Sequence, residues 1–260
     1  MAESQSPLLY DVADRIATLV INRPEQRNAI DAPTARAIQA AVDRFESDEE
    51  AWVGIITGAG DRAFCAGMDL KAFAAGQGPE LMDAKGGFAG LISYPRTKPL
   101  IAAVNGAAAG GGCEIVLACD LVVAAEHAVL GLPEVKRGIF AGAGGCFRLP
   151  RAIPRVRAME MLLTGDPIDA RSAFELGLVN RVVPGEGLMD AAREFARRVR
   201  DNAPLAVRET LALARAAFDL SEKELWARNN QAWERINRTE DAREGPLAFA
   251  EKRPPRWKAR

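Results

Sequence analysis

Residues 98–114 read KPLIAAVNGAAAGGGCE, and this stretch decides the fold. The apolar run Leu100–Val104 predicts a buried strand, three consecutive glycines follow it, and a helix expected over residues 114–119 carries Glu114 in its first turn. Glycines let a ligand approach the main chain closely, and the N–H groups at the start of a helix favour negative charge. The junction therefore predicts backbone donors facing a developing negative charge, although a tight turn without a ligand also explains the glycines.

A second junction of the same kind lies earlier in the chain. The block AFCAGMDL, residues 63–70, follows the strand-like run WVGIIT at residues 52–57. Further on, the turn GLPE at residues 131–134 places Glu134 twenty positions after Glu114. Two small-residue backbone sites and two carboxylates can together polarise a carbonyl and move a proton beside it.

These blocks resemble the crotonase superfamily, also called the enoyl-CoA hydratase/isomerase family, and most of all an enoyl-CoA hydratase. They occur in family order and span residues 22–253, nearly the whole chain. The matching segments are Asn22-Arg23-Pro24 with Asn28-Ala29, AFCAGMDL, KPLIAAVNGAAAGGGCEIVLACD, GLPEVKRGIFAGAGGCFRLPR and EGPLAFAEKR. We therefore expect an acyl-CoA thioester as the substrate.

Alternating short strands and helices predict an α/β fold over the first two-thirds of the chain. The expected strands are 16–21, 52–57, 100–104, 121–125 and 179–183, and the expected helices are 33–45 and 114–119. Periodicity alone favours an open doubly wound sheet. The resemblance instead implies a spiral of ββα repeats, and we adopt that interpretation.

From about residue 187 the pattern becomes wholly helical, with helices expected over 188–200, 205–218, 222–236 and 240–251. We therefore divide the chain into a catalytic core, residues 1–186, and a C-terminal helical region, residues 187–260. Trp226, Trp233 and Phe249 in that region are either core residues or a contact between subunits. The resemblance implies a homotrimer, or a hexamer built as a dimer of trimers, assembled through this region.

The resemblance also implies the roles of four residues in the chemistry. The N–H groups of Ala66 and Gly111 would bind the thioester oxygen as negative charge develops on it, forming an oxyanion hole. Glu114 and Glu134 would hold a water molecule between them as an acid/base pair. Many double-bond isomerases of the family lack the first of these glutamates. Having both favours reversible addition of water to a 2-trans-enoyl-CoA.

For the coenzyme A part of the substrate, the resemblance implies contacts from three segments of the chain. They are Arg27, Asn28 and Ala29; the loop Ala66, Gly67, Met68 and Asp69 with Gly111; and Phe249 with Lys252, either from the same subunit or from a neighbour. No P-loop or dinucleotide fingerprint is present and no metal-ligand spacing is visible, so we expect neither a separate cofactor nor a metal.

Composition excludes several other classes of protein. The 260-residue chain has 34 basic and 35 acidic residues, a net charge of −1, which gives no electrostatic basis for nucleic-acid binding. No apolar run of about 18 residues and no signal-like N-terminus is found, so we expect a cytoplasmic protein that spans no membrane. The four cysteines lack paired spacing and are expected to be reduced thiols. A single histidine, His127, makes a Ser-His-Asp hydrolase improbable.

Departures from the family pattern leave the acyl group open. Residues 145–149 read GCFRL where short-chain hydratases have GTQRL, Phe140-Ala141 stands where proline is common, and Lys136-Arg137 follows Glu134. The block GLPEVKRG is also similar to carnitinyl-CoA dehydratases. A related acyl-CoA dehydratase or isomerase therefore remains an alternative, as does a non-catalytic member that only binds acyl-CoA.

Overall fold

Two sheets form the centre of the computed structural model, which describes residues 6–77 and 85–260. The larger sheet has the order β1-β2-β3-β5-β7-β10, with β1 antiparallel to β2 and the other neighbours parallel. Its strands are Leu8–Ala13, Ile16–Ile21, Val53–Gly58, Leu100–Val104, Leu121–Ala125 and Arg181–Val183 in that order. The smaller sheet has the order β4-β6-β8-β9, formed by Ala63–Cys65, Ala107–Ala109, Val129–Gly131 and Ile168–Asp169.

Successive strand pairs place one strand in each sheet, which makes the chain a spiral. Strands β3, β5 and β7 lie in the larger sheet, and the strands that follow them, β4, β6 and β8, lie in the smaller one. The ββα spiral expected from the resemblance is therefore confirmed, and an open doubly wound sheet is not what forms. The smaller sheet escaped prediction because strands of only two or three residues are too short to show a periodicity.

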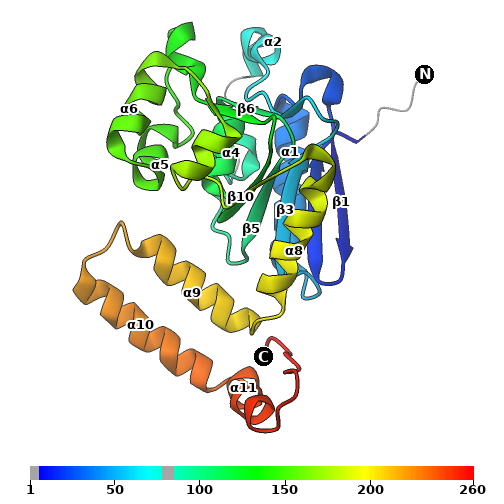
Figure 1. Ribbon diagram of the computed structural model, residues 1–260, viewed down its shortest axis with the longest axis vertical. Helices are drawn as coiled ribbons and strands as arrows, with labels where there is room; N and C mark the ends of the chain where they lie inside the picture. The colour runs from blue at the N-terminus through cyan, green and yellow to red at the C-terminus, as the bar shows by residue number, and fades with distance from the viewer. Residues whose placement is uncertain (1–5, 78–84) are drawn as a thin grey trace.

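Ten α-helices are described alongside the sheets (Figure 1), and the long ones follow the expected ranges closely. They are α1 Ala32–Ser47, α2 Leu70–Ala72, α4 Gly111–Ala118, α5 Gly145–Ala152, α6 Arg155–Thr164, α7 Ala170–Glu175, α8 Leu188–Arg200, α9 Pro204–Ala216, α10 Glu222–Asn237 and α11 Asp241–Ala250. Helix α4 begins three residues before the expected start, which places Glu114 within its first turn. A capping box formed by Ser221 and Glu224 begins α10.

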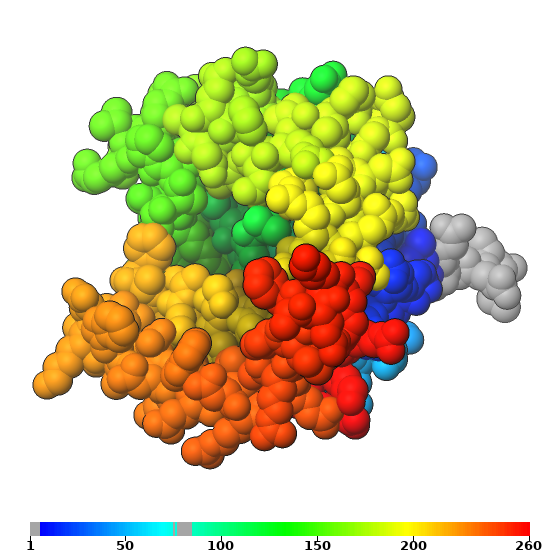
Figure 2. All heavy atoms as spheres, turned by 60° about the horizontal axis from the view of Figure 1, so that its bottom comes forward, coloured from blue at the N-terminus to red at the C-terminus, as the bar shows by residue number. Residues whose placement is uncertain are grey.

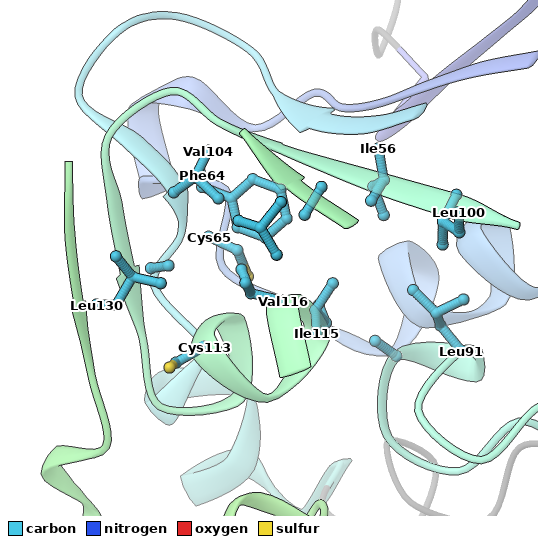
Figure 3. Close-up of a cluster of buried hydrophobic side chains, with 14 of the residues drawn as sticks. Ile56, Phe64, Cys65, Leu91, Leu100, Val104, Cys113, Ile115, Val116 and Leu130 are labelled. Atoms are coloured by element: carbon cyan, nitrogen blue, oxygen red, sulfur yellow. The ribbon is translucent and has the colours of Figure 1, made fainter. Parts of the chain in front are cut away.

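Helix α4 is packed into the main apolar cluster between the sheets. Figure 3 shows Cys113, Ile115 and Val116 of α4 in one cluster with three residues of the smaller sheet. These are Phe64 and Cys65 of β4 and Leu130 of β8. These side chains are all buried, and Phe64 is fully enclosed. Because burial of a large apolar side chain contributes about 1.5–3 kcal/mol, this packing fixes the start of α4 against β4.

Helix α8 belongs to the core by its packing. Leu188, Ala191, Ala192 and Ala196 form a second apolar cluster with residues of β2, β3, β5 and β7. The helical region expected from residue 187 thus includes one helix that covers the larger sheet. Only α9, α10 and α11 extend away from the sheets (Figure 1), and we call these three helices the arm.

The arm buries little of its own apolar surface. Trp226, Trp233 and Phe249 are 58%, 67% and 86% exposed, so they are not core residues of this chain. In Figure 2 the arm lies apart from the green elements of the core, with a hollow between them. Within the described part of the chain, no helix combines the length and the apolar character that crossing a bilayer requires.

Candidate active site

The two glycine-containing junctions meet in space, as the sequence predicts. Gly67 has a φ of +85°, and a Cβ added to it would lie 2.9 Å from the backbone nitrogen of Gly111. A Cβ on Gly112 would lie 2.0 Å from the Cys65 carbonyl oxygen. Side chains at these positions would force the loop after β4 away from the start of α4. The glycines are therefore required for the two main chains to lie in contact.

The hydrogen bonds of the loop after β4 decide which of its amides is free. The Ala66 N–H donates to the Arg27 carbonyl over 3.0 Å, and the Asp69 N–H donates to the Ile30 carbonyl over 2.8 Å. The Gly67 N–H points at the Cys65 sulfur, 3.4 Å away. Among the described residues the Met68 N–H has no acceptor. The expectation that Ala66 supplies a free donor is thus corrected, since its N–H is already occupied in the fold.

The second expected donor, Gly111, is the first residue of α4. Its N–H has no acceptor within the helix, because the first intrahelical bond runs from the Glu114 N–H to the Gly110 carbonyl, 3.0 Å. The positive end of the helix dipole adds to the field at this amide. Gly111, at the start of α4, and Met68, in the loop after β4, therefore present two amides for which the described part of the chain supplies no acceptor.

Glu114 lies three residues into α4, with its side chain only 3% exposed. One carboxylate oxygen, Oε1, accepts a hydrogen bond from the Gly145 N–H over 2.9 Å. Gly145 is the first residue of α5, so the start of a second helix faces this carboxylate. Burial nevertheless raises the pKa of Glu114 to about 7, opposed by that hydrogen bond and assisted by the negative charge of Glu134.

Glu134 comes from the short helical turn Pro133–Arg137 that follows β8. Its Oε2 is buried and has no hydrogen-bond partner among the described residues. A Cβ on Gly110 would lie 3.1 Å from its Oε1, so the carboxylate lies against the residue that precedes α4. Burial raises the pKa of Glu134 as well. A buried carboxylate oxygen without a donor requires either a proton or a ligand.

The structure therefore brings the two expected carboxylates to one place and gives them different surroundings. Glu114 has a main-chain donor, whereas the Oε2 of Glu134 has none. Each charge raises the cost of ionising the other, and the two carboxylates together hold one negative charge more easily than two. Such a pair can accept a proton on one side and donate a proton on the other.

Phe88 closes one side of this site. A Cβ on Gly111 would lie 2.4 Å from a carbon of the Phe88 ring, so the ring rests directly against the start of α4. Beyond Glu134, the exposed apolar side chains of Val135, Ile139 and Phe140 face solvent. Lys136, one of the two basic residues after Glu134, forms an ion pair with Asp166. Exposed apolar side chains thus follow Glu134 along the chain.

Residues 27–29, expected at the nucleotide, lie beside the loop after β4. Arg27 is exposed, and its carbonyl carries the Ala66 hydrogen bond described above. Asn28 is fully buried, and its side-chain amide donates to the carbonyls of Ala59 and Ala63 over 3.0 and 2.7 Å. Asn28 therefore acts in the fold, whereas the Arg27 side chain is exposed to solvent.

Phe249 and Lys252 are not brought to this site by their own chain. Phe249 lies on α11 and Lys252 follows it, at the bottom of Figure 1, whereas α2 and β6 lie near the top. Asp69, another expected contact to coenzyme A, lies at the start of α2, which it caps by accepting a hydrogen bond from the Lys71 N–H over 3.1 Å. The expected phosphate contacts from residues 249 and 252 therefore require a second copy of the chain.

Sequence reasoning did not identify Gly145 as the partner of Glu114. The GAGG block at residues 142–145 signals a helix start, yet only the folded chain shows which carboxylate it faces.

The cysteines take no part in the site. Burial raises the pKa of Cys65 to about 12, and His127 contacts the carbonyls of Asp61 and Asn105.

Comparison with known proteins gives a consistent result over the whole chain. The enoyl-CoA hydratase/isomerase family profile matches residues 11–260. A carnitinyl-CoA dehydratase from Proteus mirabilis is 44% identical over 94% of this chain and 95% of its own. An enoyl-CoA hydratase structure from Mycobacterium tuberculosis has a TM-score of 0.94 at 43% identity, covering 98% of this chain and 100% of that one. A carnitinyl-CoA hydratase structure from Mycobacterium avium has a TM-score of 0.77 at 43% identity, covering 99% and 100%.

Proposed function

Because the chain belongs to the enoyl-CoA hydratase/isomerase family, we propose that it catalyses the reversible addition of water to a 2-trans-enoyl-CoA. The observation that carries this proposal is the pair of glutamates, Glu114 buried and Glu134 half-buried with a buried Oε2, beside two amides that have no acceptor among the described residues. A protein that only binds acyl-CoA has no use for two desolvated carboxylates. Keeping them buried costs stability, which a catalytic role accounts for.

In the proposed reaction Glu114 acts as the base. It takes a proton from a water molecule, whose oxygen bonds to the β-carbon while the double bond opens toward the carbonyl. The electron pair moves onto the thioester oxygen, and Glu134 then delivers a proton to the α-carbon. The net reaction consumes one water molecule, because Glu114 takes one proton and Glu134 gives one. After the 3-hydroxyacyl-CoA leaves, transfer of one proton from Glu114 to Glu134 restores the starting protonation states.

The charge on the thioester oxygen is met by main-chain donors. We assign these donors as the Met68 and Gly111 N–H groups, because the Ala66 N–H is held by the Arg27 carbonyl. One such donor contributes roughly 3–4 kcal/mol to transition-state stabilisation in comparable oxyanion holes. The sequence led us to expect Met68 only as a contact to coenzyme A, and we now propose its N–H as an oxyanion donor as well.

We further propose that coenzyme A lies along Arg27, Ala29 and the loop from Ala66 to Asp69, with no separate cofactor. Phe249 and Lys252 of a neighbouring copy would cover the phosphates. That arrangement requires at least a second copy; we propose a homotrimer or a hexamer, for which the exposed tryptophans of the arm supply an apolar surface. Sedimentation velocity tests the assembly, and a monomer at micromolar concentration would contradict it.

The decisive experiment follows the loss of enoyl-thioester absorbance when the protein is added to crotonyl-CoA and to longer enoyl-CoAs. We expect turnover on at least one chain length. The rate should fall as the pH drops below about 7, because Glu114 must be ionised to act as a base. Folded protein without turnover on any acyl chain would leave only the binding role.

A second candidate is dehydration of a carnitinyl-type thioester. It is favoured by the 44% identity to proteins named carnitinyl-CoA dehydratase and by the GLPEVKRG block. The chemistry at the two glutamates is the same in reverse, so the acyl group alone separates the candidates. Comparing kcat/KM for crotonyl-CoA and for its γ-trimethylammonium analogue decides between them.

A further inference from the structure

The end of α9 contacts both helices that hold Glu114, and the mechanism proposed above does not use these contacts. Arg215 lies in the last turn of α9, and Asp219 follows the helix. Arg215 pairs with Asp120, directly beyond the end of α4, and Asp219 pairs with Arg151, at the end of α5. Helix α4 carries Glu114, and α5 begins with the Gly145 N–H that binds it.

The contact with α4 is extensive. The Nε and one terminal nitrogen of Arg215 donate to Asp120 Oδ1 over 3.0 and 2.6 Å, and its other terminal nitrogen donates to the Arg96 carbonyl over 2.6 Å. Asp120 also accepts from the Leu100 N–H over 2.8 Å. Since the Asp120 side chain is only 13% exposed, water screens this pair weakly.

Arg96 extends the contact to the end of α4 itself. It donates to the Ala118 carbonyl over 2.5 Å and pairs with Asp120 over 3.2 Å. The last carbonyls of a helix have no intrahelical donor, so Arg96 supplies one to α4. Arg215 therefore holds the group that caps the helix on which Glu114 and Gly111 lie.

The contact with α5 is more exposed. Arg151 and Asp219 are 3.0 Å apart, with side chains 45% and 59% exposed, so water and salt weaken the pair. Between the two ion pairs lies a cavity of about 490 Å³, lined by Leu117, Phe147, Arg148 and Phe218 among others. The end of α9 thus spans a cavity and is attached at its two sides by charge rather than by packing.

We propose that Arg215, through Asp120, is a positioning residue that couples the arm to the active-site helix α4, with Asp219 and Arg151 as a weaker second attachment through α5. The inference rests on the proposed function, because it concerns where Glu114 is held for hydration. Movement of the arm, or its burial by another copy, then alters the placement of Glu114 without any contact with substrate.

The test compares three variants with wild type in the full-length protein. Arg215→Met removes the guanidinium and keeps much of the side-chain volume, while Arg215→Lys retains a charge. Arg235→Met is the matched control, because Arg235 pairs with Glu209 inside the arm and does not reach α4. Each variant is assayed for kcat and KM with crotonyl-CoA, and for backbone hydrogen–deuterium exchange.

We expect Arg215→Met to lower kcat about tenfold with KM within twofold, and Arg215→Lys to recover part of that loss. Exchange at the α4 amides should rise in Arg215→Met while exchange in the β5 and β7 strands stays as in wild type. Arg235→Met should match wild type in both measurements.

Wild-type kcat and wild-type α4 exchange in Arg215→Met would overturn the proposal. So would faster exchange throughout the core in both Arg215 variants, which would make the residue merely structural. If wild type turns over no acyl-CoA, the proposed function fails on its own. The α4 exchange measurement then still decides whether Arg215 holds the helix.

Discussion

The junction around Glu114 and the arm differ in what each leaves unsatisfied. At the junction apolar side chains are densely packed, while two polar groups, the Met68 N–H and the Glu134 Oε2, have no partner among the described residues, and Glu114 is buried with a main-chain donor. In the arm Arg235 pairs with Glu209 and Glu244 pairs with Arg253, while the exposed tryptophans face water. The junction lacks a polar ligand, and the arm lacks an apolar partner.

The strongest test of the junction is Glu114→Gln, which keeps size and removes the base. Hydration should fall by roughly 10²–10⁴, the usual range for a general base. Acyl-CoA affinity should change little, because the main-chain donors remain. Exchange of α-protons in a saturated acyl-CoA analogue should persist in this variant and fail in Glu134→Gln. Hydration at the wild-type rate would show that Glu114 is not the base.

The same variant should be more stable than wild type at neutral and alkaline pH. The folded-state pKa of Glu114, about 7, lies above its ordinary value of 4.5, so the folded protein binds the proton more tightly. The resulting stability is fully present below pH 4.5 and is lost as the pH rises through 7. Glutamine carries no charge, so at pH 8 we expect about 1–3 kcal/mol more free energy of unfolding. Urea unfolding at pH 8 and pH 5 measures the difference, which should shrink at the lower pH.

The second test fills the space between the two amides. In Gly67→Ala the added Cβ would approach the Gly111 nitrogen to 2.9 Å and would also require a φ of +85°. We expect kcat/KM to fall about 10²-fold, comparable to losing one oxyanion donor. Gly177→Ala is the control, because Gly177 has a φ of +84° with no atom within 4 Å of the added Cβ. Equal activity in both variants would contradict a site between residues 67 and 111.

The third test removes a buried polar group of the core that is held by two main-chain carbonyls. Lys98 is 2% exposed and donates to the carbonyls of Phe45 and Asp48 over 2.6 Å each, at the end of α1. Lys98→Met removes the Lys98 donor from the Phe45 carbonyl and leaves the Asp48 carbonyl with only the Ala51 N–H, and it should cost about 1–3 kcal/mol of stability. Lys223→Met, on the exposed start of α10, should change stability by less than about 0.5 kcal/mol. Activity per folded molecule should stay at the wild-type level, which separates this polar group from those of the site.

The sequence predicted five of the six strands of the larger sheet, all but β1, and the long helices, because their apolar residues recur with the period of a strand or a helix. It predicted the two glutamates because they follow glycine-rich turns of a recognisable family. It did not predict which amides are free, since the Ala66 hydrogen bond to the Arg27 carbonyl joins segments 39 residues apart. The Arg215–Asp120 pair joins residues 95 positions apart and has no local pattern.

The smallest effect is expected from the arm. Trp233 is 67% exposed, so Trp233→Gln removes little buried surface from its own chain. We therefore expect the unfolding free energy of the dissociated chain to change by less than about 0.5 kcal/mol. If copies of the chain cover this face, the same substitution should weaken their association, measured as a shift of the sedimentation profile to smaller species. An unchanged profile together with a large loss of chain stability would mean that Trp233 is a core residue, and the contrast between arm and junction would fail.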